Sequence, residues 1–150
     1  MRRIALAAGL ALALAIPAAA AAPSKGTVVK AVYNKALKAT ILVDGRGMSL
    51  YIWTADTPRN HSVCRPDPGC NPLWPSLEAP ATAGPGVKAS LLGVTDDGKQ
   101  VTYAGHPLYY FHGGHGTGTS DKKPGDLNGQ GVYAVWWVIT PKGATIKKIP

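Results

Sequence analysis

Glutamate is almost missing from this sequence of 150 residues, in which Glu78 is the single example. Familiar catalytic signatures are missing too: the chain has no Gly-x-Ser-x-Gly elbow, no His-Glu-x-x-His motif and no phosphate-binding loop. It also has no convincing amphipathic helix after the N-terminal region. Because no recognisable catalytic arrangement emerges, we predict that the protein is not an enzyme.

Cysteine is confined to Cys64 and Cys70. Two cysteines at short spacing in an oxidising compartment are most simply explained as a disulfide. A redox pair usually has the spacing Cys-x-x-Cys, and a structural zinc site needs four ligands. We therefore predict a structural disulfide between Cys64 and Cys70.

Residues 1–22 have the three parts of a secretory signal peptide. Met1–Arg3 is positively charged, Ile4–Ile16 is apolar, and Pro17 is followed by alanines that offer cleavage sites. The apolar run is shorter than the roughly 20 residues of a transmembrane helix. No cysteine follows it to carry a lipid anchor. We predict export to the periplasm or the exterior and a mature domain, residues 23–150, without a transmembrane segment.

Basic residues outnumber acidic ones, with 16 lysines and arginines against 8 aspartates and glutamates and a formal net charge of +8. The lysines are scattered along the chain. A nucleic-acid surface would favour Arg-rich clustering on a matching fold, and export also argues against it. The charge therefore predicts a solvated basic surface and no nucleic-acid partner.

One short pattern occurs twice. Gly47-x-x-Leu-Tyr51-x-Trp53 recurs as Gly105-x-x-Leu-Tyr109-x-Phe111, and the offset is constant, since 105 − 47 and 109 − 51 both equal 58. Internal repeats at a fixed offset indicate duplicated structural units. We predict one domain made of two related units, about residues 27–80 and 85–150.

Short runs rich in β-branched and aromatic residues alternate with Gly, Pro and Asp turns. Lys35–Lys38 continues the first strand or forms a turn of helix. Residues 40–54 are expected to form a hairpin around Asp44–Gly47, and 81–86 a connector. We predict an all-β fold of about eight short strands, a small sandwich or partly closed barrel with one local disulfide. The expected strands are 27–33, 40–43, 49–54, 89–95, 100–103, 107–111, 132–139 and 144–149.

Two stretches carry a family resemblance. Residues 51–56 read Tyr-Ile-Trp-Thr-Ala-Asp, and Cys64-x5-Cys70 leads into Trp-Pro-Ser-Leu at 74–77. In the second copy Asp121 is the counterpart of Asp56, after an insertion over residues 112–118. The sequence resembles the bacterial secreted-repeat family of unknown function, predicted lipoproteins with the motif Tyr-x-(Phe/Trp/Tyr)-x-x-Asp. This chain lacks their lipid-bearing cysteine, and the resemblance implies no biochemical activity.

The repeated motif is the first candidate site. Side chains alternate along a strand, so Tyr51 and Trp53 lie on one face and Leu50 and Ile52 on the other. One interpretation is an aromatic platform that stacks on a sugar or another flat ligand; the other is a core face, with the aspartate capping the next turn. The candidate ligand-binding residues are Tyr51, Trp53, Asp56, Tyr109 and Phe111.

The glycine-rich loop is the second candidate site. Its possible metal ligands are His112, His115, Asp121 and Asp126, and imidazole suits copper or zinc. The alternative is a solvated loop without a metal. Asp126-x-Asn-x-Gln130 resembles the opening of a calcium loop, but its twelfth position is Trp137 instead of the required glutamate.

These features predict an exported binding module whose ligand is an envelope component or a transition-metal ion. The alternative is a structural or protein-interaction module that uses exposed aromatic residues. Its oligomeric state does not follow from the sequence.

Overall fold

The structure is a computed structural model that describes residues 26–57, 59–64, 70–114 and 116–150. The predicted signal peptide, 1–22, and His115 lie outside the described residues. The elements are β1 (Thr27–Asn34), β2 (Ala39–Asp44), β3 (Tyr51–Trp53), α1 (Cys70–Leu73), β4 (Ala81–Ala83), η1 (Ala89–Leu91), β5 (Leu92–Val94), β6 (Val101–Tyr103), β7 (His106–Pro107), η2 (Val132–Ala134) and β8 (Trp136–Val138).

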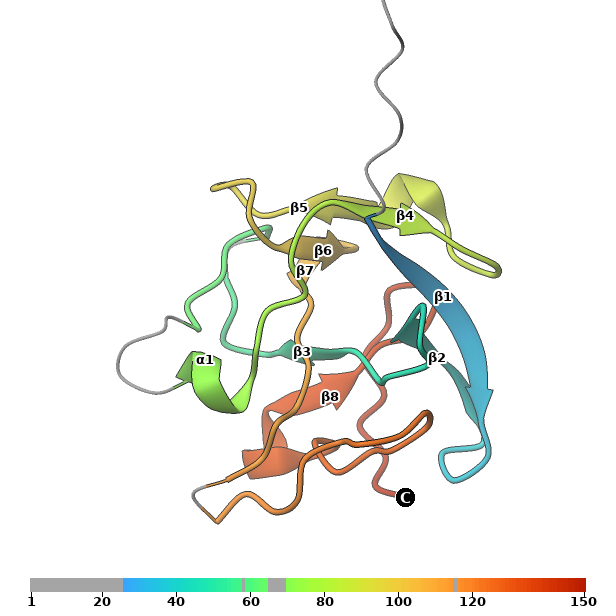
Figure 1. The fold of residues 1–150 in the computed structure, drawn as a ribbon, viewed down its shortest axis with the longest axis vertical. Coiled ribbons are helices and arrows are strands. Elements are labelled where there is room, and N and C mark those ends of the chain that lie inside the picture. The colour runs from blue at the N-terminus through green and yellow to red at the C-terminus, as the bar shows by residue number, and fades with distance from the viewer. Residues whose placement is uncertain (1–25, 58, 65–69, 115) are drawn as a thin grey trace, which may run out of the picture.

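The strands form three small sheets, with the orders β2-β1-β4, β3-β8 and β5-β6-β7. In Figure 1 the β3–β8 pair lies near the centre, β1 and β2 run along one side, and β5 to β7 lie towards one end. The predicted strand-rich class with one local disulfide is confirmed, and the sheets are not closed into a barrel.

The central pair is extended by isolated bridges. Tyr51 pairs with Val138 of β8 on one side and with Tyr109 on the other, and Tyr109 pairs in turn with Ser76. The two Tyr51–Tyr109 backbone hydrogen bonds, one in each direction, are both 2.9 Å long. The two copies of the repeated motif therefore lie side by side, antiparallel, in the middle of the molecule.

Side-chain alternation along this layer divides the core in two. Tyr51 and Tyr109 pack into one hydrophobic cluster, and Leu50, Ile52 and Leu108 into another. All five side chains are at most 1 % exposed. The predicted alternation is confirmed, because a strand buried on both sides sends successive side chains into opposite cores.

The first cluster is built around stacked indoles. Trp136 lies between Trp74, at 3.8 Å and 3° between ring planes, and Trp53, at 5.1 Å and 7°. The Tyr51 ring meets Trp74 edge-on, and the Tyr109 ring meets Trp136 in the same way. Aromatic pairs of this kind contribute about 0.5–1.5 kcal/mol each beyond the area they bury.

Other backbone contacts come in corresponding pairs. The Leu42 amide donates to the Ile139 carbonyl, as the Val101 amide does to the Leu77 carbonyl, at 3.0 and 2.8 Å. Likewise Leu50 donates back to Leu42, and Leu108 to Val101, at 3.1 and 2.9 Å. Two related units packed face to face would produce such pairs. The duplication itself stays a prediction.

The disulfide between Cys64 and Cys70 is present. Cys64 is buried in the first cluster, and Cys70 begins α1, which leads directly into the buried Trp74. The covalent link therefore holds the entry of Trp74 into the aromatic stack.

Several predicted elements are wrong in detail. Residues 132–134 form the turn η2 rather than the start of a strand, because Tyr133 and Ala134 have left-handed backbone angles, φ 50° and 56°. Residues 81–83 form strand β4, parallel to β1, where a flexible connector was expected. At the end of the chain the expected strand 144–149 is reduced to one bridge, between Ile139 and Thr145.

The expected hairpin over residues 40–54 exists only around its turn. One bridge joins Val43 to Ser49, whereas β2 pairs along its length with β1, and β3 pairs with β8. The undecided segment 35–38 is a turn, in which the Asn34 carboxamide oxygen accepts the Ala36 and Leu37 amides. That local bond stops β1 from continuing.

Gly129 tests the tightness of the aromatic cluster. A Cβ atom at this position would lie 2.9 Å from Phe111 and from Trp74, whereas one at Gly45 would lie 3.6 Å from its nearest neighbour. Gly129→Ala should therefore lower the free energy of unfolding by about 1–3 kcal/mol through overpacking. Gly45→Ala is the matched control and should leave it nearly unchanged. Urea unfolding of both variants measures this; equal midpoints would contradict the packing.

Candidate functional site

The two tyrosines of the repeated motif exchange partners. The Tyr51 hydroxyl donates to the carboxylate of Asp121 at 2.7 Å, and the Tyr109 hydroxyl donates to Asp56 at 2.6 Å. Each tyrosine thus bonds to the aspartate that follows the other copy. The hydroxyls have further partners: the Gly129 amide for Tyr51, and Ser62 for Tyr109.

The two aspartates also hold the segments that follow them. Asp56 accepts the Val63 amide at 2.8 Å, and Asp121 accepts the Asn128 amide at 2.9 Å. Burial raises the pKa of both carboxyl groups above the ordinary aspartate value, although the tyrosine hydroxyls act in the opposite direction. Burial raises the pKa of both tyrosines as well. At neutral pH the tyrosines are therefore firm hydrogen-bond donors.

These contacts place most of the first candidate site in the core. Tyr51, Tyr109 and Phe111 are 0 % exposed and Asp56 is 4 % exposed, while Trp53 is half-buried at the end of the indole stack. A stacking platform needs ring faces at the surface, and these three rings offer none. The geometry instead matches the alternative interpretation, a core face with an aspartate that caps the following loop.

The second candidate site is the glycine-rich loop with its predicted metal ligands. His112 is exposed, and its amide donates to the Leu73 carbonyl. Asp121 is engaged by Tyr51, and Asp126 accepts the amides of Lys122 and Lys123. Among the described residues there is no group of three or more His, Cys, Asp or Glu side chains that could hold a metal. Because His115 lies outside them, copper or zinc binding by this loop stays a prediction.

Gln130, one of the predicted ligands in the hypothetical calcium loop, is engaged elsewhere. The Gln130 side chain is buried, and its oxygen accepts the Val138 amide at 2.9 Å. Its nitrogen donates to the carbonyls of Ile146 and Lys148. Gln130 therefore fastens the C-terminal segment to β8 and presents no oxygen to a cation.

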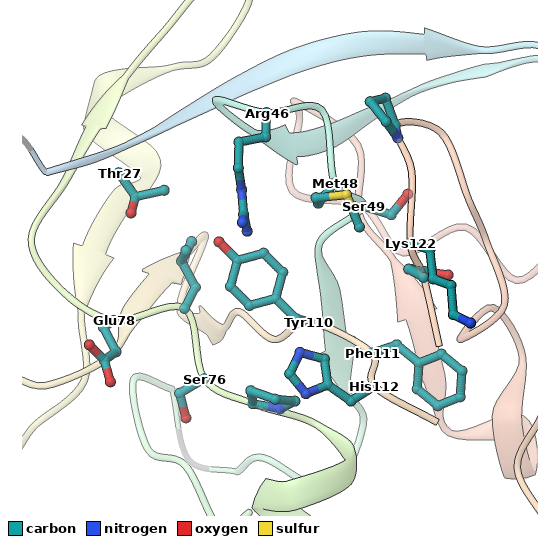
Figure 2. A pocket seen from close by; sticks show the side chains of 14 residues that line it. Thr27, Arg46, Met48, Ser49, Ser76, Glu78, Tyr110, Phe111, His112 and Lys122 are labelled. Carbon is teal, nitrogen blue, oxygen red and sulfur yellow. The ribbon is translucent and has the colours of Figure 1, made fainter. Parts of the chain in front are cut away.

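An open cavity of about 660 Å³ lies between the β2–β3 turn and the two segments at residues 75–78 and 110–112. Figure 2 shows Tyr110 in the middle of this cavity, with Arg46 reaching towards its hydroxyl, His112 beside its ring, and Lys122 and Glu78 on opposite sides. The described lining residues are Thr27, Arg46, Met48, Ser49, Pro75, Ser76, Leu77, Glu78, Tyr110, Phe111, His112, Asp121, Lys122 and Pro124.

A buried carboxylate organises one wall. Asp44 is 1 % exposed and accepts the amides of Arg46 and Met48, both at 2.9 Å, within the turn. It also accepts Arg46 Nε at 3.0 Å and the Tyr110 hydroxyl at 3.1 Å. Four donors therefore balance one buried charge, as burial of a carboxylate requires.

The Arg46 guanidinium is fixed through its Nε atom, while most of the side chain stays exposed. The hydrogen bond to Asp44 uses Nε, and it raises the pKa of the guanidinium. The Arg46 side chain is 75 % exposed, and its guanidinium carbon lies 5.8 Å from the centre of the Tyr110 ring. Burial and the nearby Asp44 raise the pKa of Tyr110 to about 12, so its phenol stays neutral. The cavity therefore combines a fixed cation with an aromatic surface.

The sequence predicts only a turn at Asp44–Gly47, so the grouping of Asp44, Arg46 and Tyr110 does not follow from it. One signal was available: Asp44 directly follows the apolar run of β2, and an arginine stands two residues later. A carboxylate at the end of a buried strand needs partners. The position of Tyr110 beside it could not be predicted from spacing, because the two residues are 66 positions apart.

The fold and cavity thus describe a small, disulfide-linked β protein with an open polar and aromatic cleft. Residues 92–140 match a family described as a secreted repeat of unknown function, which confirms the resemblance over that segment. That description supports an exported protein. No curated protein and no solved structure gives a significant match to this chain. None of the helices in the described ranges has the length and apolar character needed to cross a bilayer.

Removing Asp56 or Asp121 tests whether their hydrogen bonds with Tyr109 and Tyr51 stabilise the fold. Asp56→Ala leaves the Tyr109 hydroxyl and the Val63 amide without this acceptor, so the free energy of unfolding should fall by about 1–3 kcal/mol. Asp121→Ala should have a similar effect through Tyr51 and Asn128. Asp96→Ala is the control, because its carboxylate is exposed and its one short contact, 2.7 Å to His61, is a surface pair that should contribute little. Thermal unfolding gives the comparison. An unchanged melting temperature for both test variants would mean that the exchanged bonds do not stabilise the fold.

The raised pKa values of Asp56 and Asp121 predict a pH dependence. A carboxyl whose pKa is higher in the folded state favours folding most strongly below its unfolded pKa, and this contribution is lost as pH rises through the folded value. Relative to the double variant Asp56→Asn/Asp121→Asn, the wild type should therefore gain stability as pH falls from 7 towards 4. Urea midpoints at each pH measure the difference. A difference that does not change with pH would contradict the shifts.

Proposed function

We propose that the protein is an exported binding module whose cleft around Tyr110 takes an acidic carbohydrate of the cell envelope. The observation that carries the proposal is the juxtaposition of Arg46 with the Tyr110 ring inside an open cavity of about 660 Å³. This volume falls in the range of about 300–1,000 Å³ that is usual for small-ligand sites.

The charges in the cleft favour a carboxylate. Bonding of Arg46 Nε to Asp44 fixes the guanidinium, so its terminal nitrogens can donate to an incoming anion without first being ordered. Lys122 is exposed and lines the same cavity. An exposed ion pair between one of these two cations and a ligand carboxylate gives a modest, salt-sensitive attraction. A single sugar carboxylate is therefore a better match than a densely charged polymer.

The remaining lining suits the rest of a sugar ring. One face of a pyranose is made of C–H groups, which pack on an aromatic side chain such as Tyr110. Sugar hydroxyls need acceptors as well as donors, and Glu78 and Ser76 lie on the opposite side from Lys122. Because Glu78 is exposed and negative, it would also disfavour a second acidic group at that end.

A protein-interaction module is the second candidate. Its support is the exposure of two aromatic side chains, Tyr33 at 59 % and Tyr133 at 71 %. They belong to separate elements, β1 and η2. The cleft is the stronger basis, because there the aromatic and charged groups converge.

Calorimetric titration of the mature protein with cellobiouronate, a disaccharide that carries one carboxylate, tests the cleft. We expect binding that weakens with added salt, and little binding of cellobiose, the neutral control of the same size. The double variant His112→Ala/Lys122→Ala should lose affinity by about tenfold or more, equivalent to about 1.4 kcal/mol. Lys142→Ala, which removes an exposed lysine away from the cavity lining, should bind like the wild type.

Arg46→Gln should have the largest effect, since it removes the cation over Tyr110. Equal binding of the acidic and the neutral sugar, or equal affinity of the wild type and the double variant, would contradict the proposal. Unfolding temperatures without ligand distinguish lost binding from lost structure.

A further inference from the structure

A second cavity, of about 510 Å³, lies between the β1–β2 hairpin and the loop at Pro124 and Gly125. The loop is fastened to the hairpin side at two points. The Asn34 side-chain amide donates to the Gly125 carbonyl at 3.1 Å, and the Gly125 amide donates to the Gly47 carbonyl at 3.2 Å. The cavity is therefore a formed slot with a tethered edge.

The interior of this slot is mainly apolar. Ile41 and Val43 of β2, both 1 % exposed, provide its base. Val32 of β1 pairs with Ile41 on the same face of the sheet and is 42 % exposed. Covering the Val32 side chain would remove apolar surface from water, which contributes roughly 25 cal/mol per Å².

Positive charge surrounds the apolar interior. The charged residues among its described lining are Lys30, Lys35 and Arg46, without an aspartate or glutamate. Lys30 is steadied by a 2.9 Å hydrogen bond from its ammonium group to the Gly45 carbonyl. Lys35 is exposed at the turn after β1. The slot therefore complements a molecule with one apolar body and a negative end.

We propose that this slot binds a free, single-chain fatty acid, with the acyl chain along Val32 over Ile41 and Val43 and the carboxylate at Lys35. The carboxylate can take a charge-assisted hydrogen bond from the Lys35 ammonium group. The chain brings no polar groups that would need partners inside the slot.

A peptide is a poorer fit than an acyl chain. Its backbone would carry amide and carbonyl groups that lose hydrogen bonds to water when they enter an apolar slot. The neutral amide in the lining, Asn34, is already engaged: its nitrogen bonds to Gly125, and its oxygen accepts the Ala36 and Leu37 amides. The lining thus favours a ligand whose polarity is confined to one end.

The test is calorimetric titration of the mature protein with laurate, below the concentration at which laurate forms micelles. Ala36→Phe narrows the slot from an exposed turn position, and Lys35→Glu reverses the charge at its rim. Each should weaken laurate binding about tenfold or more. Lys88→Glu, at an exposed lysine outside the lining, is the matched control and should bind like the wild type. The alcohol 1-dodecanol, which has the same chain length without the charge, should bind at least about tenfold more weakly.

Laurate affinity that is unchanged by both Ala36→Phe and Lys35→Glu would overturn the proposal, as would dodecanol binding as tightly as laurate. If Ala36→Phe lowers the melting temperature of the ligand-free protein, Val32→Ser replaces it, because Val32 is partly exposed. The variant His112→Ala/Lys122→Ala separates this slot from the sugar cleft. This double variant should bind laurate like the wild type. If it loses laurate affinity while Ala36→Phe keeps it, laurate binds in the cleft, and the proposal for the slot is overturned.

Discussion

The exchange of hydrogen bonds between Tyr51 and Asp121, and between Tyr109 and Asp56, is the constraint on which the rest of the structure depends. It places two similar strands antiparallel at the centre and fastens the loop after each strand to the other strand. Because these groups are buried or half-buried, loss of one partner costs the other a short hydrogen bond that water does not readily replace. The two hydrophobic clusters then fill the space on either side of this layer.

This arrangement separates the residues that build the fold from those that are available for binding. The aromatic residues of the repeated motif are used by the core, and their aspartates are used by the loops. What remains at the surface comes from the turns: Arg46 after β2, and His112 and Lys122 beyond the second motif. The proposed cleft and the proposed slot share Arg46 and Pro124 and lie next to this fixed frame. Binding there would require little rearrangement of the core.

Much of the fold could be predicted from local patterns. The β-branched runs, the Asp-Gly turn at residues 97–98 and the period-two alternation indicated the strands, the β5–β6 hairpin and the two faces of the central layer. The disulfide followed from the cysteine spacing and the compartment. The predicted strand start at residues 132–134 was wrong. Tyr133 there has a left-handed backbone conformation, which the surrounding packing determines and the side-chain pattern does not show. The role of β4 was missed because small residues carry little pattern of their own.

The candidate sites were harder to predict, since they depend on contacts between distant residues. The repeated motif suggested a ligand-binding surface. Its alternation shows which side chains share a face of the strand, but it does not show whether other segments bury that face. The Asp44–Arg46–Tyr110 group joins the β2–β3 turn to a residue 66 positions after Asp44, and no local pattern links them. A short polar turn after a buried strand was the one available indication.

The most direct test follows the backbone amides of the isotopically labelled protein by NMR while cellobiouronate is added. We expect the largest chemical-shift changes at Arg46, Tyr110, His112 and Lys122, with Tyr51 and Asp56 nearly unmoved. Changes centred on Tyr51, Asp56 and Tyr109 would contradict it, because the repeated motif would then be the binding site and not the frame.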